Sequence, residues 1–362
     1  MKMSVNEDEK WMNRCLALAA KGYGSVSPNP LVGAVVVKHG KILGEGFHKK
    51  FGEAHAEVNA INDVLRKHQS LEGATLYVNL EPCSHVGKTP PCADAIIEHR
   101  FSRVVIAMQD PNPLVAGRGI RKLRKAGIDV AADVLRDDAV KLNEAFVKFI
   151  TKRVPFVLLK VAQTSDGFIA QSSGSSRWIT SKASRVFVHQ LRSRYDAVLV
   201  GAGTAISDNP QLTVRHIKGR NPLRVLIDGR LRTPLRSKLF TDRHRSRTIV
   251  YTANRKKSKQ LQRKGIMVRI CREENFQISL RAVLSDLASH NVASVMVEGG
   301  QQMFEQFLRQ RLADKIIVFQ SPKQFHKGIP AFGKMTNRFH LKNVSHRKIG
   351  TDSMEEGYVV YD

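Results

Sequence analysis

The sequence predicts an α/β fold divided between two domains. At 362 residues the chain is longer than a single hydrophobic core usually supports. Both halves alternate short apolar strands with amphipathic helices, which is the pattern of a layered α/β domain. The two halves show no internal repeat, so we expect two different folds joined together.

The first half opens with an amphipathic helix pattern, DEKWMNRCLALAA, and continues with two strands joined by a tight turn at His39-Gly40. Strands and helices then alternate as far as residue 150. The expected strands cover 31–38, 41–48, 75–80, 103–108 and 128–133. The expected helices cover 8–20, 55–68, 90–99, 119–127 and 137–150.

The helical pattern stops near TKRVP (151–155), where a proline precedes a new apolar strand. We therefore expect one domain over residues 1–150 and a second over 151–362. In the second half the expected strands cover 156–162, 195–203, 222–228, 247–253, 292–300 and 315–322. Helix patterns lie between them at 181–193 and 279–290.

The composition points to the cytoplasm. Four cysteines (Cys15, Cys83, Cys92 and Cys271) are too few for a disulfide scaffold and fit a reducing compartment. No apolar run approaches the roughly 20 residues that span a bilayer. The segment MKMSVNEDEKWMNRC lacks the apolar core of a secretory signal. We therefore predict a cytoplasmic protein with no membrane partner.

The formal net charge of +27 predicts anionic ligands. Basic residues are concentrated at RHRSR (243–247) and RKKSKQLQRK (255–264), without interleaved aromatic residues that would stack on bases. We read these runs as solvated surface and expect a phosphorylated small molecule rather than a specific nucleic acid. A homo-oligomer is also expected.

A metal site is predicted by His55, Cys83 and Cys92, each placed at a strand–helix junction. One imidazole and two thiolates leave one position of a tetrahedral zinc ion open for water, as a catalytic zinc requires. Glu57 stands two residues from the imidazole and could collect the proton of that water and deliver it to a leaving amine. The order His-Ala-Glu, Pro-Cys, Cys is that of the zinc deaminases, with the loop SHVGKTPP inserted between the cysteines.

Four segments carry a closer resemblance: SPNPLVGAVVV, GEGFHKKFGEAHAEVNAI, LYVNLEPCSHVGKTPPC and DPNPLVAGRGI. Together they resemble the deaminase half of the bacterial bifunctional riboflavin-biosynthesis deaminase/reductase family. The resemblance implies that Asn29 holds the pyrimidine, and that other residues contact base, ribose or phosphate. Asn29 and Asn112 are flanked by prolines, so structural turns are an equal alternative there. The implied contacts are His48, His85, Lys88, Asp110 and Asn112.

The second half resembles the reductase half of the same family at LLKVAQTSDGFIA, GSSRWITS, VGAGTAISDNPQLTVR and VMVEGG. From the residues alone, VEGGQQMF is a strand, a glycine turn and a helix start, which can present backbone N–H groups to a phosphate. The resemblance implies substrate contacts at Lys160, Ser176, Arg192, Leu212, Arg215 and Glu298. It implies an NADPH site lined by Gln163, which the family varies, and by Trp178, Thr204, Asp208, Gly229, Gly299, Gly300 and Gln301. Arg192 and Arg215 could each grip a phosphate bidentately.

The resemblance thus implies a cytidine-deaminase-like three-layer α/β/α domain followed by a dihydrofolate-reductase-like α/β domain. It implies two steps on one substrate, 2,5-diamino-6-ribosylamino-4(3H)-pyrimidinone 5′-phosphate: zinc-dependent hydrolytic deamination, and then NADPH reduction of the ribosyl side chain to a ribityl group. The residues leave open a nucleic-acid base deaminase, and a basic nucleic-acid-binding protein whose structural zinc takes His85 as a fourth ligand.

Overall fold

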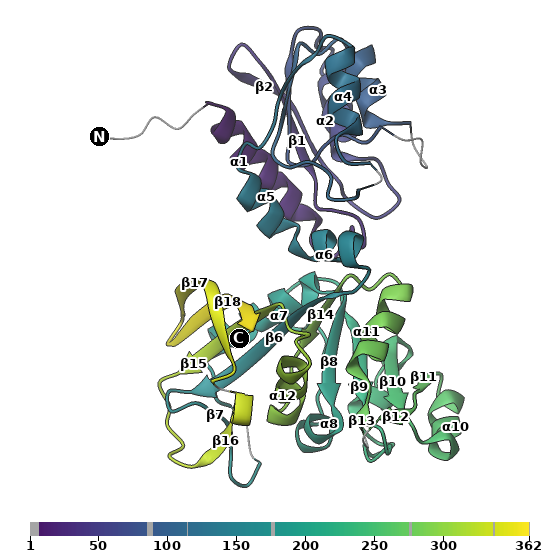
Figure 1. Cartoon of the computed structure of the whole chain (residues 1–362), viewed down its shortest axis with the longest axis vertical. Coiled ribbons are helices and arrows are strands. Elements are labelled where there is room, and N and C mark those ends of the chain that lie inside the picture. Colours follow the sequence, from purple (N-terminus) through teal and green to yellow (C-terminus); the bar gives the residue numbers. More distant parts are fainter. Residues whose placement is uncertain are drawn as a thin grey trace. The chain divides into compact units, whose positions relative to one another are not determined.

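The computed structural model describes residues 7–84, 90–113, 115–174, 178–274, 277–335 and 337–361. The chain divides into two compact units, Met1–Arg153 and Val154–Asp362 (Figure 1). Each unit has its own sheet and its own apolar core, as two different α/β folds should. None of the helices in the described ranges is long and apolar enough to cross a membrane.

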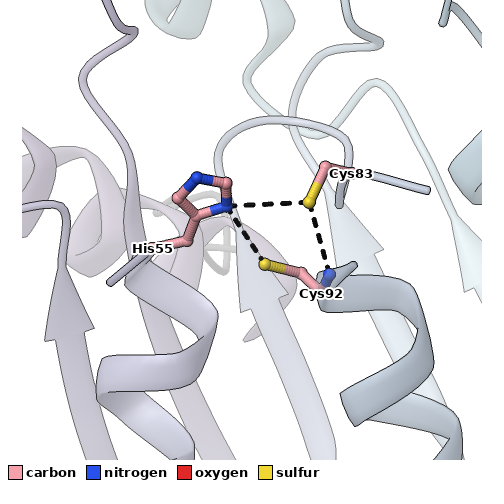
Figure 2. A group of neighbouring side chains, drawn as sticks. All are labelled: His55, Cys83 and Cys92. Atoms are coloured by element: carbon pink, nitrogen blue, oxygen red, sulfur yellow. Dashed lines mark hydrogen bonds between the residues drawn. The ribbon is translucent and has the colours of Figure 1, made fainter. Parts of the chain in front are cut away.

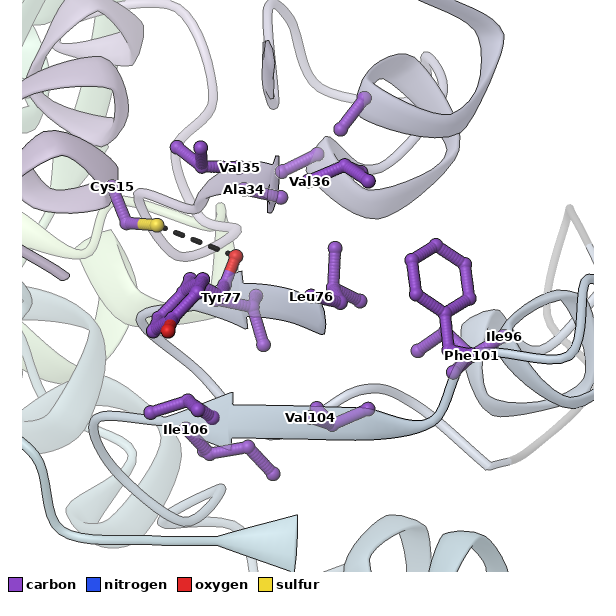
Figure 3. Close-up of a cluster of buried hydrophobic side chains, with 14 of the residues drawn as sticks. Cys15, Ala34, Val35, Val36, Leu76, Tyr77, Ile96, Phe101, Val104 and Ile106 are labelled. Atoms are coloured by element: carbon purple, nitrogen blue, oxygen red, sulfur yellow. Dashed lines mark hydrogen bonds between the residues drawn. The ribbon is translucent and has the colours of Figure 1, made fainter. Parts of the chain in front are cut away.

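The first unit is built on a five-stranded sheet of order β2-β1-β3-β4-β5. β1 pairs antiparallel with β2 and β3, and β3, β4 and β5 are parallel. Buried side chains such as Val35, Leu76 and Val104 fill its core (Figure 3). The strands are β1 Gly33–Lys38, β2 Lys41–Phe47, β3 Thr75–Val78, β4 Arg103–Ile106 and β5 Asp129–Ala131. The helices are α1 Glu7–Ala19, η1 Ala20–Gly22, α2 Ala56–Leu65, α3 Cys92–Glu98, α4 Arg118–Lys125, α5 Arg136–Leu142 and α6 Glu144–Lys152.

Glycines set how closely two helices approach the β1–β2 hairpin. A Cβ atom at Gly33 would collide with the Cys15 carbonyl oxygen on α1, and one at Gly46 would collide with the Ala56 carbonyl oxygen on α2. Gly46 on β2 pairs with Ala34, the neighbour of Gly33 on β1. Paired residues share a face and neighbouring residues of a strand alternate, so Cβ atoms at Gly33 and Gly46 would point to opposite sides of the sheet. α1 and α2 therefore cover opposite faces, which gives the three layers expected from the sequence.

The predicted single helix over 137–150 is wrong. The structure has α5 and α6 instead, separated by Asn143, whose backbone leaves the helical conformation at φ −104° and ψ 19°. The buried Asn143 side chain accepts a hydrogen bond from Leu31 N (2.8 Å) and donates one to Leu31 O (3.0 Å). Asn143 keeps backbone hydrogen bonds to Ala139 and Val147, so the break is a local kink, and its side chain ties this kink to a distant segment that local periodicity could not reveal.

The second unit is built on a nine-stranded sheet of order β11-β10-β9-β8-β14-β6-β15-β18-β17. Its strands are parallel from β11 to β15, and β18 and β17 extend it with antiparallel pairing. The strands are β6 Phe156–Thr164, β8 Ala197–Gly201, β9 Leu223–Ile227, β10 Thr248–Thr252, β11 Met267–Ile270, β14 Ser294–Val297, β15 Lys315–Ser321, β17 Phe339–Ile349 and β18 Asp352–Tyr361. Two short pairs stand apart from it: β7 Phe168–Gln171 with β16 Gly328–Pro330, and β12 Glu273–Glu274 with β13 Gln277–Ile278.

Helices cover both faces of this sheet. On β6, Leu159 joins the core that contains α11 and α12, whereas Leu158 joins the core that contains α7 and α10. The neighbouring side chains of a strand point to opposite faces, so the two helix pairs lie on opposite sides. The helices are α7 Lys182–Arg194, α8 Ala202–Asp208, α9 Lys238–Thr241, η2 Arg245–Arg247, α10 Arg255–Arg263, α11 Leu280–Ser289, α12 Gln301–Arg309 and η3 Gly333–Met335.

Candidate active sites

The three predicted metal ligands come together in the first unit, although they arrive on three different segments (Figure 2). His55 is the N-cap residue of α2, Cys83 lies in the segment after β3, and Cys92 is the first residue of α3. His55 Nδ1 lies 3.3 Å from Cys92 Sγ and 3.6 Å from Cys83 Sγ. One ligand atom from each residue lies within 4.8 Å of the other two.

Backbone hydrogen bonds fix the two cysteines relative to each other. Cys92 N donates to Cys83 Sγ at 3.3 Å, and Ala93 N donates to the Cys83 carbonyl oxygen at 3.1 Å. The first turn of α3 therefore holds the Cys83 segment in place. Hydrogen bonds from the Cys92 side chain, from His55 and from Cys92 N lower the pKa of the Cys83 thiol, while the contact with Cys83 and burial raise the pKa of the Cys92 thiol, so the thiolate charge is placed on Cys83.

The donor set fits a catalytic zinc ion. One imidazole nitrogen and two sulfurs are grouped within the described residues, and in a four-coordinate zinc site these three ligands would leave one position for water. The lowered pKa of Cys83 favours the thiolate that binds metal. Residues 85–89 of the loop between the cysteines lie outside the described residues, so the predicted contacts His85 and Lys88 are not placed.

Glu57 lies in the first turn of α2, where its side chain is buried beside the metal ligands. Its carboxyl group hydrogen-bonds with the Cys92 side chain. Burial, together with the neighbouring Cys83 thiolate, raises the pKa of Glu57 to about 7. A carboxyl group with such a pKa can both accept and release a proton near neutral pH, as a proton shuttle must.

Asn29 and His48 form a pair on the same side of the unit as His55. The His48 ring stands edge-on to the His55 ring, with 5.7 Å between centroids. His48 Nδ1 lies 3.1 Å from the Ala54 carbonyl oxygen, which can only accept, so Nδ1 carries the proton. Burial lowers the pKa of His48, and its neutral Nε2 accepts a hydrogen bond from Asn29 Nδ2 at 3.2 Å. The pairing fixes which way the Asn29 amide points.

Two buried asparagines that the sequence analysis did not single out hold the segment that follows Asn29. Asn79 donates to Leu31 O (2.9 Å) and accepts from Gly33 N (2.7 Å), while Asn143 bonds both backbone groups of Leu31. Their side chains thereby complete the hydrogen bonds of a buried, non-repetitive backbone. An asparagine gives no distinctive sequence signal for this role.

The remaining predicted deaminase residues, Asp110 and Asn112, lie in the loop between β4 and α4. Asp110 Oδ1 accepts a hydrogen bond from Asn112 N at 2.8 Å. Asp110 N in turn donates to the carboxylate of Glu81, which the sequence analysis did not single out. Glu81 lies two residues before Cys83, so this loop is tied to the segment that carries a metal ligand.

In the second unit most of the predicted cofactor residues lie at one edge of the sheet. Thr204 and Asp208 follow β8, Gly229 follows β9, and the turn Glu298–Gln301 follows β14. These strands are neighbours and run parallel, so their carboxyl ends share an edge. Ligands of open α/β sheets bind at this edge.

Close packing supports this arrangement. A Cβ atom at Gly299 would lie 2.9 Å from Thr204 Oγ1, and Gly300 has a φ of +63°, which glycine adopts most readily. Gln301 opens α12 and its Nε2 lies 3.3 Å from Glu305 Oε1. The glycine turn after β14 is therefore needed for the approach of α8.

Two other predicted cofactor residues, Trp178 and Gln163, lie on segments outside β8, β9 and β14. The Trp178 side chain is exposed and stacks against Arg185, whose guanidinium carbon lies 4.7 Å from the ring centroid. Gln163 lines a cavity of about 570 Å³ with Phe332 and Phe339. It occupies an odd-numbered position of β6, so it faces the opposite side of the sheet from Lys160.

A buried ionic network joins three predicted substrate residues. Glu298 accepts from Arg192 Nε (2.6 Å) and Nη2 (2.9 Å), and Lys160 Nζ lies 3.2 Å from Glu298 Oε2. The neighbouring cations Arg192 and Lys160 outweigh burial and hold the pKa of Glu298 well below its usual range. Arg192 Nη1 donates to Thr213 O. Glu298 therefore occupies the Nε and Nη2 donors of Arg192 in this arrangement, and phosphate binding by Arg192 stays a prediction.

Arg215 differs from Arg192 in its surroundings. Its Nη1 donates to Thr213 Oγ1 at 2.9 Å, and its backbone N donates to Nδ1 of His189, a buried residue that sequence reasoning missed. Burial and the nearby Arg192 lower the pKa of Arg215, so an anion would stabilise its charge. The buried Leu212 lies in the same loop at φ 53°, whereas the predicted Ser176 lies outside the described residues.

Two family models match the chain. Residues 5–108 match the cytidine and deoxycytidylate deaminase zinc-binding region, and residues 155–354 match the RibD C-terminal domain. The predicted fold class, a cytidine-deaminase-like domain followed by a dihydrofolate-reductase-like domain, is confirmed.

Curated relatives and solved structures match over nearly the whole chain. The riboflavin biosynthesis protein RibD of Aquifex aeolicus is 42% identical over 98% of both chains, and that of Escherichia coli K12 is 35% identical over 96% of this chain and 98% of its own. The crystal structure of a diaminohydroxyphosphoribosylaminopyrimidine deaminase/5-amino-6-(5-phosphoribosylamino)uracil reductase from Thermotoga maritima is 41% identical, with a TM-score of 0.87 and coverage of 98% of this chain and 99% of that chain. The chain therefore belongs to the RibD family of riboflavin-biosynthesis proteins, bifunctional enzymes that join a deaminase to a reductase.

Proposed function

We propose that residues 1–150 remove an exocyclic amine from 2,5-diamino-6-ribosylamino-4(3H)-pyrimidinone 5′-phosphate, and that residues 151–362 then reduce its ribosyl side chain with NADPH. The observation that carries the proposal is the convergence of His55, Cys83 and Cys92 beside the buried carboxyl group of Glu57. The Thermotoga maritima relative is named for these two activities, which supports the same pair here.

In the deaminase site, His55, Cys83 and Cys92 would hold the zinc ion. When bound, zinc lowers the pKa of a water molecule towards neutrality and so makes hydroxide available. Glu57 takes the proton of that water and passes it to the amine as it leaves as ammonia. Asn29, oriented by His48, holds the pyrimidine against this carboxyl group.

In the reductase site, NADPH supplies the hydride to the first carbon of the opened ribose. The carboxyl edge of β8, β9 and β14 holds the cofactor through Thr204, Asp208 and the turn at Gly299–Gly300. Arg215 takes the substrate phosphate. The guanidinium of Arg192 is bonded to the Glu298 carboxylate, whereas the guanidinium of Arg215 is bonded to the neutral hydroxyl of Thr213. Lys160, held by Glu298, approaches the ribose.

One assay tests the proposed function. The protein is incubated with the diaminopyrimidinone phosphate, with and without NADPH, and the products are identified by mass. We expect ammonia release without NADPH and the ribitylaminouracil phosphate with it. In parallel, tRNA and oligonucleotides are incubated at about 150 mM salt, near physiological ionic strength. Conversion of a base in the polymer would replace the proposed substrate with a nucleic acid.

Substitution of any metal ligand should abolish deamination. His55→Ala, Cys83→Ser and Cys92→Ser each remove one of three ligands, so zinc content and deamination should both fall to near zero. Metal analysis and the ammonia assay measure the two quantities. Cys271→Ser, in the other unit, is the matched control and should change neither. A ligand variant that kept full zinc and full activity would contradict the assignment.

The two activities should respond independently to substitution. Asp208→Ala or Arg215→Ala should impair reduction and leave deamination unchanged, because both residues belong to the second unit. Both rates are measured on the same purified chain, with each substrate supplied separately. Loss of deamination in an Asp208→Ala protein that still folds and binds zinc would show that the activities are not divided as proposed.

A further inference from the structure

Glu81 is a buried carboxylate that neither the metal site nor the substrate contacts described above use. Glu81 is only 5% exposed and lies in the segment between β3 and Cys83. A carboxylate in such a place is costly unless hydrogen bonds compensate for its lost hydration. Its partners therefore indicate what it does.

Three backbone N–H groups donate to this carboxylate. Glu81 Oε2 accepts from Asp110 N at 3.1 Å and from Gly117 N at 2.9 Å, and Oε1 accepts from Ile120 N at 3.1 Å. Asp110 lies near the start of the loop that joins β4 to α4, and Gly117 is the N-cap residue of α4. One side chain thus binds both ends of the loop.

The same carboxylate caps α4. The N-cap residue Gly117 has no side chain to accept the first N–H groups of that helix, and Glu81 accepts from Gly117 and Ile120 instead. A negative charge at a helix N-terminus is also favoured by the helix dipole. α4 is therefore anchored to the segment that leads to Cys83.

Gly119 makes this approach possible. A Cβ atom there would collide with the Pro82 carbonyl oxygen and would lie 3.2 Å from Glu81 Oε1. Inside the loop, Asp110 Oδ1 accepts from Asn112 N, and Asn112 O accepts from Val115 N and Ala116 N. The positions of Asp110 and Asn112 therefore depend on the two ends that Glu81 holds.

We propose that Glu81 is a positioning residue for deamination, which holds Asp110 and Asn112 at a fixed place relative to the metal centre. The proposal rests on the proposed deaminase function and on the assignment of these two residues to substrate contact. Glu81 acts on substrate binding through the loop, and it contributes neither a metal ligand nor a proton.

Glu81→Gln in the full-length chain tests this. The amide keeps one acceptor oxygen and places an NH2 group against at least one backbone N–H, so the loop loses part of its anchor while side-chain volume is kept. We expect the KM for deamination to rise about tenfold or more with a smaller change in kcat, because the lost interactions act on binding. Zinc content and the reduction rate should stay at wild-type values. Amide hydrogen exchange should accelerate at Asp110 and Asn112 and over residues 115–120.

Gly119→Ala is a second variant, which pushes α4 away from the Glu81 segment while leaving Glu81 itself unchanged, and it should give the same pattern. Glu98→Gln, at an exposed position at the end of α3, removes a charge from the same unit and should change none of these readouts. A Glu81→Gln protein with wild-type KM and wild-type exchange over the loop would overturn the proposal. So would loss of zinc in proportion to activity, or accelerated exchange over the whole unit, because Glu81 would then support the metal or the fold at large.

The wild-type rate in the same assay reports on the proposed function itself. If the wild-type protein left the diaminopyrimidinone phosphate unchanged, the proposed function would fail. The exchange comparison between Glu81→Gln and wild type would still decide whether Glu81 anchors the loop.

Discussion

Glu57→Gln should retain zinc and deaminate about 10²–10⁴-fold more slowly than the wild type, the usual cost of losing a general acid–base group. The amide is nearly isosteric with the carboxyl group, so the first turn of α2 and the ligand His55 should keep their places. Glutamine cannot accept the proton of the attacking water or deliver one to the departing amine. The burial that raises the pKa of Glu57 to about 7 suits the wild-type carboxyl group to both transfers.

The measurements for Glu57→Gln are zinc per chain, the rate of ammonia release and the rate of reduction, all on one preparation. Glu53→Gln is the matched control, because Glu53 is exposed and lies two residues before His55. Its zinc content and both rates should match the wild type. Deamination by Glu57→Gln at near the wild-type rate would exclude Glu57 as the proton shuttle.

Glu298→Gln should destabilise the second unit by about 3–5 kcal/mol, the range for breaking a buried ion pair from one side. The side chains of Glu298, Lys160 and Arg192 are 6%, 12% and 12% exposed, so the substitution leaves two largely buried cations without their anion. Reduction should also fall, since Lys160 and Arg192 would lose the group that orients them. Hydrogen exchange of β6 and β14 in the full chain measures the local change in unfolding free energy.

Glu355→Gln, which breaks an exposed ion pair, is the control for Glu298→Gln. Glu355 pairs with His346 at 3.5 Å on the surface, and exposed pairs are worth about 0–1 kcal/mol. Equal effects of the two substitutions would show that burial does not set the strength of the Glu298 network.

The network also predicts a pH dependence. The folded pKa of Glu298 lies below the ordinary value of 4.5, so the carboxylate stabilises the folded unit fully above about pH 4.5. This contribution is lost as the pH falls below that value towards the folded pKa. In acid, therefore, the wild-type unit should lose more stability than the Glu298→Gln unit does. The difference in unfolding free energy between the two proteins should become smaller. A difference in unfolding free energy that grew on acidification would contradict the lowered pKa of Glu298.

The elements that the sequence predicted best are those with strong local periodicity. The hairpin at His39-Gly40 and the parallel strands of both units follow from apolar runs bounded by turn residues. β17 was not predicted, because most of its side chains are exposed and it alternates too weakly. The break at Asn143 was missed for a different reason: the side chain at the break bonds to Leu31, which is 112 residues away in the sequence.

The residues of the candidate sites also differ in whether the sequence alone could predict their roles. The metal ligands could be read from residue type and order, since zinc requires particular donors. The partner of Arg192 could not, because Glu298 lies 106 residues away and only the folded unit brings α7 next to the end of β14. The roles of Glu81 and Asn79 are equally hidden, because backbone N–H groups of distant loops leave no trace in the sequence.

The bonds between Asn143 and Leu31 bear on how short a stand-alone deaminase could be made. The deaminase zinc-binding match ends at residue 108, yet Leu31, two residues after Asn29, has both backbone groups bonded to a side chain between α5 and α6. A fragment trimmed to the matched region would expose the buried amide of Leu31 and remove one of the two asparagines that hold the segment after Asn29. An excised enzyme must therefore keep α5 and α6 as a C-terminal tail, and its natural cut point is after Arg153.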